Sequence, residues 1–560
     1  MPKEIIPGNL IITPLKNMAA VILASLLFAA SHPNLLFAKG LPLLAWISLV
    51  PVFWVVRQNS YPSLIIYGAF YGYASYGLFN YWLSVFHPLA GLIVGSIYLV
   101  YFAFLFPLLH LAHKLFPLRG YILHWLIWIA YEYLKTQAFL GYSYGVMGYS
   151  QWNIIPLIQI ADLAGVWIVS ALVVFPSAWL AGFFCFSDIV RESVTLNEFL
   201  LRMRIYFRRE RLPIIIWFAV LVLSFIYGFT SQINYTDADT IRIAMIQHNT
   251  DPWAPSHAPT YPQAMAEYRN DFNILRRLSD EALAAYPDTD MVVWSETAFV
   301  VRIYWHTTYR DDPLSWDLVR DLMTYLRSQE VPFVFGNDDA RRDPAINPDP
   351  LTSHRIDYNA VMLYDRGELA GIYRKQHLVP FTEHFPYRRQ LPWIYEALRN
   401  ADTHFWERGN EATVLESRGI RFSTPICFED TFGYLTREFV RNGAELIVNL
   451  SNDAWSASLA AQMQHLSMAI FRSVENRRSM ARSTSSGQTA AIDPNGRIIA
   501  MAEPFTEAWL SVEVPIISTP FTVYTRYGDY LGMIFFWLSI FMLIIGGVLY
   551  IIKKFQGRSL

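Results

Sequence analysis

Charged side chains are scarce in this 560-residue chain. Asp, Glu, Lys and Arg make up 16% of it and hydrophobic residues 54%, whereas an ordinary soluble protein carries about 25% charged residues. This balance argues against a soluble protein and indicates a membrane protein. The net charge of −2 provides no basic surplus to attract a polyanion, so no nucleic-acid partner is expected.

Cysteine is scarcer still, with Cys185 and Cys427 as its two occurrences. Cys185 lies in an apolar stretch far from Cys427, which argues against a disulfide framework and against a structural zinc site. No metal or cofactor is expected. A single cysteine is usually a small buried hydrophobe, but Cys427 lies in the more polar part of the chain and is also a candidate nucleophile.

Long apolar runs, in contrast, are abundant. Seven lie in the first 234 residues and an eighth near the end, at 15–31, 41–57, 62–84, 89–113, 120–138, 156–184, 213–231 and 529–552. Because a bilayer core requires about 20 apolar residues per helix, the pattern predicts eight transmembrane helices. The first run continues into further spans and is therefore not interpreted as a cleaved signal peptide.

The basic residues of the connecting loops are distributed unequally. Numbered from the N-terminus, the loops form two alternating sets. The loops of one set carry Lys3, Lys16, Arg57, Lys114, Arg119, Arg191, Arg202, Arg204, Arg208, Arg209, Arg211, Lys553, Lys554 and Arg558. The short loops of the other set carry little beyond Lys39 and Lys135. The positive-inside rule assigns the basic set to the cytoplasm. Residues 232–528 are then predicted to be extracytoplasmic, with both termini in the cytoplasm.

The segment 235–525 has a different pattern, in which short β-branched runs alternate with polar helical stretches such as 262–284 and 316–329. The strand candidates are 241–247, 290–294, 331–335, 359–364, 420–427, 445–450 and 508–514. Such alternation is typical of an α/β fold with a sheet buried by helices. The predicted domains are seven transmembrane helices in 1–234, a catalytic domain in 235–525, and a last transmembrane helix with a cytoplasmic tail in 526–560.

Three of the apolar strands are followed by a reactive residue, namely Glu296, Lys375 or Cys427. Each alone is more simply explained as a surface loop residue or, for the cysteine, a buried hydrophobe. Together they suggest a site, because α/β sheets carry their sites at the carboxyl ends of strands. A thiol needs a base or a positive neighbour to become a nucleophile, and Glu296 and Lys375 supply these groups if the fold unites them.

The order of four motifs resembles a known family. WSE ends at Glu296, YRKQHLVPFTE runs from Tyr373 to Glu383, CFE begins at Cys427, and SNDAW ends at Trp455. This order resembles the nitrilase superfamily, and within it the apolipoprotein N-acyltransferases, which N-acylate bacterial lipoproteins. The resemblance covers nearly the whole chain. It implies a multi-span helical membrane domain and a nitrilase-like αββα sandwich outside the cytoplasm.

The resemblance also implies roles for single residues. It makes Glu296 the general base, Cys427 the nucleophile, and Lys375 the stabiliser of the oxyanion together with the backbone N–H of Phe428. It assigns supporting or substrate-binding roles to Glu383, Glu429, Phe428, Trp253 and Trp455. The chain departs from the family pattern at Phe428, where the family often has Tyr, at Ser456-Ala457 in place of Phe-Gly, and at Ser485-Ser486 before Gly487.

The reaction implied by the resemblance is a ping-pong acyl transfer through a cysteine thioester. The donor is a membrane phospholipid, and the acceptor is the N-terminal α-amine of a diacylglyceryl-cysteine apolipoprotein. The expected setting is the bacterial inner membrane, with the catalytic domain on the periplasmic side and the protein a monomer.

Two other functions use the same features. A membrane-anchored amidohydrolase of the nitrilase type needs the same three residues with water as acceptor. A non-enzymatic transporter or sensor would need intramembrane charges along a path, and the main candidates are Glu132, Lys135 and Asp162, which are interpreted as structural. The aromatic-rich segments 299–316 and 385–406 fit either loops packed on the core or lids that admit lipid.

Overall fold

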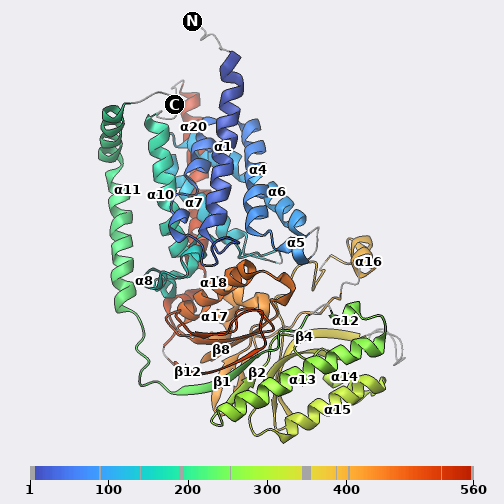
Figure 1. The fold of residues 1–560 in the computed structure, drawn as a ribbon. Helices are drawn as coiled ribbons and strands as arrows, with labels where there is room; N and C mark the ends of the chain where they lie inside the picture. The colour runs from blue at the N-terminus through green and yellow to red at the C-terminus, as the bar shows by residue number, and fades with distance from the viewer. Residues whose placement is uncertain are drawn as a thin grey trace.

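The computed structural model describes residues 7–86, 90–138, 140–187, 195–251, 254–342, 355–385, 387–400, 404–518 and 520–556. Figure 1 shows a helical region stacked on an α/β region. The helical region comprises α1 (Pro7–Ser31), α2 (Pro42–Ala45), α3 (Val50–Gln58), α4 (Tyr61–Phe79), α5 (Leu83–Phe86), α6 (Ala90–Leu115), α7 (Gly120–Leu134), α8 (Ile155–Ile158), α9 (Ala161–Ala164), α10 (Val166–Ser187), α11 (Leu196–Thr230) and α20 (Tyr530–Phe555). The start of α1 and the end of α20 lie at the end of this region far from the sheets (Figure 1).

Each of the eight predicted apolar runs contains helix, but three of them are interrupted, and the run at 62–84 divides into α4 and α5. The run at 41–57 divides into α2 and α3, and the run at 156–184 into α8, α9 and α10. Gly165 separates α9 from α10 with a φ of +68°, a conformation that glycine adopts readily. Five described helices are long and apolar enough to cross a membrane, namely α1, α6, α10, α11 and α20. The count of eight spans stays a prediction.

Helix α11 begins 17 residues before the run predicted at 213–231, at Leu196. Thr195 starts it with a capping box, in which its hydroxyl accepts the backbone N–H of Glu198 and the Glu198 carboxylate accepts the Thr195 N–H. The backbone at Glu210 is non-helical, just before Pro213, because proline clashes with the preceding turn. The arginines at 202–211, predicted to lie in a loop, are therefore on a kinked helix.

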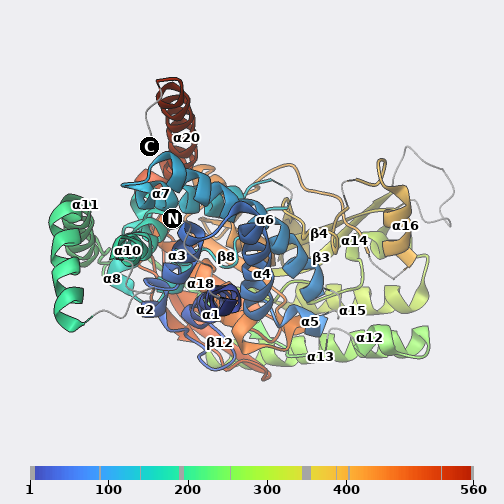
Figure 2. The same ribbon diagram turned by 90° about the horizontal axis from the view of Figure 1, so that it is seen from above.

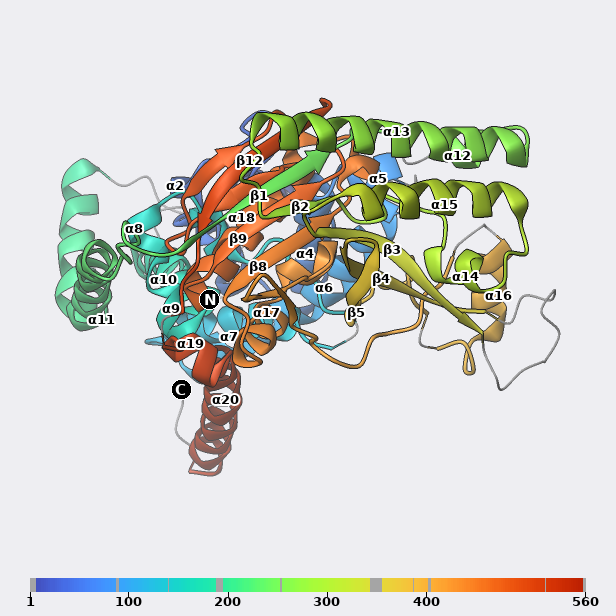
Figure 3. The same ribbon diagram turned by 90° about the horizontal axis from the view of Figure 1, so that it is seen from below.

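The α/β region contains two six-stranded sheets (Figure 3). The first has the order β12-β1-β2-β3-β4-β5, with β1 parallel to β2 and β2 parallel to β3. Its strands are β1 (Thr240–Gln247), β2 (Met291–Val293), β3 (Phe333–Arg342), β4 (Arg355–Asp365), β5 (Glu368–Arg374) and β12 (Ala508–Pro515). The second sheet has the order β11-β10-β9-β8-β7-β6. Its strands are β6 (Leu415–Ser417), β7 (Ile420–Ser423), β8 (Leu446–Ser451), β9 (Ser479–Thr484), β10 (Ala490–Ile492) and β11 (Ile498–Met501).

Helices cover the outer face of each sheet. Helices α13 (Tyr261–Ala285) and α15 (Pro313–Ser328) lie side by side across the first sheet (Figure 3). Leu318, Leu322 and Leu326 of α15 are buried at a spacing of four residues, which gives that helix one apolar face toward the sheet. Helices α17 (Gly433–Arg441) and α18 (Leu459–Asn476) form the helical layer on the second sheet. The order of helical layer, sheet, sheet and helical layer confirms the predicted αββα sandwich.

Helix α18 joins the sandwich to the helical region above it (Figure 2). Its Gln464 accepts a hydrogen bond from the Trp82 indole at 3.0 Å and donates to the Phe79 carbonyl at 3.1 Å. Farther along, Glu475 accepts the backbone N–H of Val166 at 3.1 Å. Buried polar side chains of α18 therefore bond to the ends of the apolar helices, and one hydrophobic core runs through both regions.

Candidate active site

Cys427 lies just beyond the carboxyl end of β7, the strand between β8 and the edge strand β6 of the second sheet. The strand ends at Ser423, and Ile426 forms one further bridge with Leu450 of the neighbouring strand β8. Cys427 then begins a 3-10 turn, Cys427–Thr431. It is partly buried and has a φ of +49°. The sequence predicted a strand over 420–427, and this prediction was wrong after Ser423, where β7 ends.

Glu296 comes from the first sheet, three residues after β2. Its Oε1 accepts a hydrogen bond from Asn359 Nδ2 of β4 at 2.9 Å, and its Oε2 accepts the backbone N–H of Asn452 at 3.1 Å. Asn452 follows β8, so the second bond crosses between the two sheets. A Cβ at Gly336 would lie 2.9 Å from Glu296 Cα, so glycine permits the close approach of β3 to the Glu296 backbone.

Lys375 follows β5 directly and is fully buried. Its backbone N–H donates to the Asn359 carbonyl at 2.8 Å, so the same β4 residue orients both Lys375 and Glu296. The Lys375 ammonium donates to Glu296 Oε1 at 3.2 Å and to Glu383 Oε1 at 2.8 Å. The structure therefore brings together the base and the cation that the sequence could only assume to be close.

The electrostatics of this cluster favour a protonated lysine. Burial alone would lower the pKa of Lys375, but the charges of Glu296 and Glu383 raise it above its ordinary value. Burial raises the pKa of Glu383, and Lys375 opposes that rise. The second oxygen of Glu383 accepts the backbone N–H of Val379 at 2.9 Å, which fixes the carboxylate that faces the lysine.

The thiol of Cys427 is held in its neutral form. Burial raises the pKa of Cys427 well above its ordinary value, Glu296 raises it further, and Lys375 lowers it. These surroundings disfavour the thiolate, so the sulfur needs a base when it reacts. Glu296 is the carboxylate whose charge acts most strongly on that sulfur.

Glu429 connects the nucleophile turn to the lysine loop. One carboxylate oxygen accepts the backbone N–H groups of Gln376 at 2.7 Å and His377 at 2.9 Å. The other accepts the N–H of Ile426 at 2.8 Å, and the hydroxyl of Tyr373 donates to both oxygens at 2.9 Å. Burial raises the pKa of Glu429 to about 7. Glu429, predicted as a supporting residue, is thus a buried carboxylate that joins the turn at Cys427 to the loop after Lys375.

A second buried network behind the nucleophile was not predicted. His465 of α18 lies between two carboxylates, with Nε2 at 2.6 Å from Asp430 and Nδ1 at 2.9 Å from Asp453. Arg482 of β9 contacts the same two carboxylates. His465 Nε2 also lies 3.3 Å from the carbonyl oxygen of Cys427. The available signal was Asp430 next to the CFE motif and Asp453 inside SNDAW, but nothing in the sequence linked either to His465.

The remaining predicted residues have mixed outcomes. The buried Phe428 ring has its centroid 4.9 Å from that of Phe432 and 6.5 Å from that of Tyr142, a residue that follows α7 in the helical region. Trp455 contacts Trp82 of the helical region at 5.5 Å between ring centroids. Trp253 lies outside the described residues. In the segment 385–406, helix α16 (Pro392–Asn400) leaves Trp393 68% exposed, so whether this segment is a lid stays a prediction.

The charges inside the helical region have protein partners. Glu132 accepts hydrogen bonds from Trp128, Ser170 and the backbone N–H of Met147. Lys135 donates to the Tyr76 hydroxyl and the Tyr144 carbonyl. Asp162 pairs with Arg477 of the sandwich at 2.6 Å. These partners fit the structural roles that the sequence suggested.

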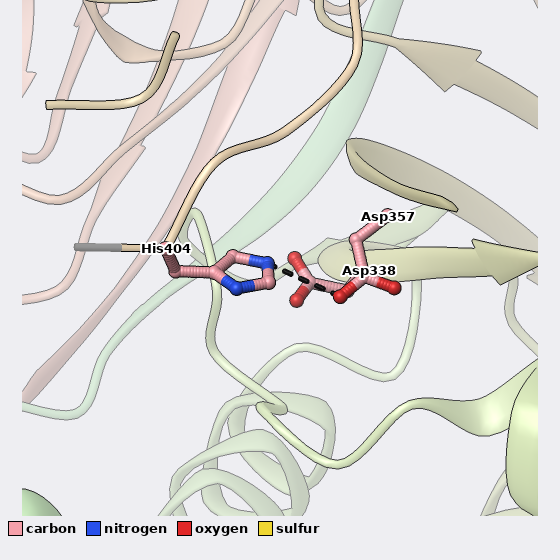
Figure 4. A group of neighbouring side chains, drawn as sticks. All are labelled: Asp338, Asp357 and His404. Atoms are coloured by element: carbon pink, nitrogen blue, oxygen red, sulfur yellow. Dashed lines mark ion pairs between the residues drawn. The ribbon is translucent and has the colours of Figure 1, made fainter. Parts of the chain in front are cut away.

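Asp338, Asp357 and His404 bring one ligand atom each within 4.8 Å of the others and are the one group of described residues with a metal-like arrangement (Figure 4). Arg302 already lies 3.2 Å from Asp357 and 3.4 Å from Asp338, and Arg355 lies 2.6 Å from Asp357. Although burial opposes them, His404 and these arginines lower the pKa of Asp357. The cluster is thus already neutralised by side-chain cations.

Comparison with known proteins gives matches over both regions. The family model described as carbon-nitrogen hydrolase matches residues 242–519, and the one described as apolipoprotein N-acyltransferase N-terminal domain matches residues 23–179. Apolipoprotein N-acyltransferase 1 of Treponema denticola is 42% identical over 97% of this chain and 98% of its own length. Its counterpart in Treponema pallidum is 43% identical over 96% of both chains. Apolipoprotein N-acyltransferase 2 of Treponema denticola is 27% identical over 93% of this chain and 96% of its own.

Proposed function

This chain belongs to the apolipoprotein N-acyltransferase family and is an acyltransferase, and from this premise we propose the substrates and the chemical path of its reaction. It moves one acyl chain from a membrane phospholipid to the N-terminal α-amine of a diacylglyceryl-cysteine lipoprotein. The acyl chain is carried in between as a thioester on Cys427. The observation that carries the proposal is the single buried cluster in which Lys375 contacts both Glu296 and Glu383 and in which Glu296 and Lys375 act on the Cys427 thiol.

In the first half-reaction, Glu296 takes the thiol proton as Cys427 Sγ attacks the ester carbonyl of the phospholipid. The carbonyl oxygen becomes an oxyanion, which Lys375 stabilises with its positive charge. The backbone N–H of Phe428 also contributes, since the first N–H groups of a helical turn have no partner within that turn. When the oxyanion collapses, the glycerol oxygen leaves and receives the proton from Glu296, which releases a lysophospholipid.

In the second half-reaction, the α-amine of the lipoprotein attacks the thioester carbonyl. Glu296 takes a proton from the amine nitrogen, and Lys375 again stabilises the oxyanion. The carbon–sulfur bond breaks, the sulfur takes up the proton from Glu296, and the product is an amide. Because the amine reacts only after the lysophospholipid has left, the two substrates use the same site in turn.

A membrane setting suits both substrates, since each carries long acyl chains that remain in a bilayer. We propose eight spans, with seven in residues 1–234 and the last in 526–560, and a catalytic region of residues 235–525 outside the cytoplasm of the bacterial inner membrane. The position of the start of α1 and the end of α20 at the same far end of the helical region (Figure 1) supports this arrangement. So does the clustering of basic residues on the predicted cytoplasmic side.

The test is an assay with purified enzyme, one phospholipid and a diacylated lipopeptide. The proposal expects triacylated lipopeptide and lysophospholipid in equal amounts. Steady release of free fatty acid in place of the triacylated product would favour the amidohydrolase-type alternative, with water as acceptor.

A further inference from the structure

A cavity of about 160 Å³ lies beside the catalytic cluster. It is lined by Ala138, His377, Leu378, His384, Arg408 and Tyr434. Since one water needs about 10–15 Å³ of such space, the cavity has room for a polar group of several heavy atoms. None of the triad residues lines it, so it is a separate compartment of the same site.

The cavity has a positive charge with no protein counter-charge. Arg408 donates from Nε to the Gln376 carbonyl at 2.8 Å, and within the described part of the chain no carboxylate pairs with its guanidinium. The neighbouring cations differ, because Lys375 pairs with two glutamates and Arg374 pairs with Asp339. A guanidinium with free N–H groups is suited to bind phosphate oxygens.

His377 provides a second unused polar group at this cavity. Its side chain is buried, with Nδ1 at 2.7 Å from the Tyr434 hydroxyl, and its Nε2 has no partner. Burial, together with the charges of Arg408 and Lys375, lowers the pKa of His377 to about 3, so the ring is neutral. When the Tyr434 hydroxyl donates to Nδ1, the proton resides on Nε2. A buried donor without a partner is uncommon in folded proteins and is suited to an external acceptor.

The cavity also lies beside the end of the helical region that meets the sandwich, where the proposed spans would place the lipid headgroups. Ala138 is four residues beyond the end of α7, and α7 ends beside the sandwich, as do α1 and α11 (Figure 1). The ends of membrane-spanning helices mark the boundary between hydrocarbon and headgroups. The cavity is close to the nucleophile as well, because the His377 ring lies 5.8 Å from the ring of Phe428, the residue after Cys427.

We propose that this cavity binds the phosphate of the glycerophospholipid acyl donor, an inference that rests on the proposed function. Arg408 pairs with a phosphate oxygen, and His377 and Tyr434 supply neutral hydrogen bonds. In a glycerophospholipid only the glycerol separates the phosphate from the acyl esters. A phosphate held here therefore brings an ester carbonyl to Cys427, and an acyl ester without phosphate lacks this anchor.

The experiment compares two acyl donors with identical acyl chains, a glycerophospholipid and a diacylglycerol, using the full-length enzyme in detergent micelles. The readout is the rate of triacylated lipopeptide formation as each donor is varied. Arg408→Gln should raise the phospholipid KM by roughly 10- to 100-fold, the range for loss of a charge-assisted hydrogen bond, and leave diacylglycerol kinetics unchanged. Arg408→Lys should recover part of the loss. The control Arg320→Gln, an exposed arginine on α15, should affect neither donor.

Two results would overturn the inference while leaving the proposed function intact. One is equal use of the two donors by the parent enzyme. The other is an equal loss on both donors in Arg408→Gln, which would mean that the contact of Arg408 with Gln376 is its only role. Absence of triacylated product with either donor would instead overturn the proposed function, and this inference with it.

Added inorganic phosphate distinguishes a site for the phosphate of the lipid headgroup from a site for free phosphate. If the cavity binds the headgroup, inorganic phosphate should compete with the phospholipid and have no effect on diacylglycerol kinetics. Inhibition that does not depend on the phospholipid concentration would identify a site for free phosphate and overturn the assignment to the donor.

Discussion

One carboxylate oxygen of Glu429 lies 2.9 Å from the backbone nitrogen of His377. Glu429 is two residues after the candidate nucleophile, and His377 is two residues after the candidate oxyanion stabiliser. Because the other oxygen of Glu429 accepts the N–H of Ile426, this side chain fixes the distance between Cys427 and Lys375. Acyl transfer depends on that distance, since a displacement of about 1 Å can cost 100-fold in rate.

Glu429→Gln keeps the shape of the side chain but replaces one acceptor oxygen by an amide nitrogen, which cannot accept the backbone N–H groups. We expect kcat to fall by about 100-fold with a smaller change in KM, measured as triacylated lipopeptide formed per minute. Glu438→Gln, an exposed position on α17, is the matched control. Parent-like kcat in Glu429→Gln would show that the two loops are held by other contacts.

Lys375→Met removes the cation from between two buried carboxylates. Glu296 and Glu383 then lack their shared partner, and the oxyanion loses its main stabiliser, so acyl transfer should fall by roughly 1000-fold. Glu296→Gln should have a loss of similar size, because the raised pKa of the Cys427 thiol makes a base necessary. Glu281→Gln, at an exposed position on α13, serves as control. Activity within a few-fold of the parent in either variant would exclude that residue from the chemical step.

The buried histidine His465 predicts how stability changes with pH. Burial alone would lower its pKa, but Asp430 and Asp453 raise it to about 9. A histidine whose pKa is raised on folding contributes stability that is complete below pH 6.5 and is lost as the pH rises through about 9. This contribution is about 3 kcal/mol. The Tm of the parent should therefore fall between pH 7 and 9.5, and the fall should be smaller in His465→Gln.

The exposed His257→Gln is the control for this experiment and should follow the parent. A parent Tm that does not change over this range, or that changes equally in His465→Gln, would mean that the histidine is not charged in the folded protein.

The predicted topology can be tested with reporter fusions. A reporter inserted near Asp237, which follows α11, should be active on the extracytoplasmic side, and a reporter at the C-terminus on the cytoplasmic side. The expectation rests on the basic residues of one set of loops and on the position of both helix ends far from the sandwich (Figure 1). Activity of both reporters on the same side would contradict a single span between the catalytic region and the C-terminus.

The pattern of apolar residues along the chain was enough to predict most of the fold. Seven strand candidates correspond to β1, β2, β3, β4, β7, β8 and β12, and the two predicted helical stretches are α13 and α15. Strand β9 escaped detection because it is polar in sequence yet completely buried. Its Arg482 is neutralised by Asp430 and Asp453, and such tertiary pairing cannot be read from a local pattern.

The candidate site was predictable only in its main residues. The motifs indicated Glu296, Lys375 and Cys427, and the resemblance added Glu383 and Glu429 as supporting residues, but neither assigned a role to Asn359, Asn452 or His465. Asn359 bonds to Glu296 and Lys375 from a strand that appears simply apolar in sequence, and Asn452 contributes a backbone N–H. A backbone donor has no sequence signature. The left-handed turn at Cys427 was also unpredictable, since non-glycine residues seldom adopt positive φ.

The central claim is that Cys427 carries the acyl chain, and the most direct test is the intact mass of purified enzyme incubated with one defined phospholipid and no acceptor. We expect an added mass of one acyl chain on the peptide that contains Cys427, one lysophospholipid released per site, and loss of the adduct in neutral hydroxylamine. Cys427→Ala should remain unmodified, whereas Cys185→Ala, altered within the apolar helix α10, should be acylated like the parent. An enzyme that forms triacylated lipopeptide yet never has an acyl adduct at Cys427, even after rapid quenching, would contradict the thioester mechanism.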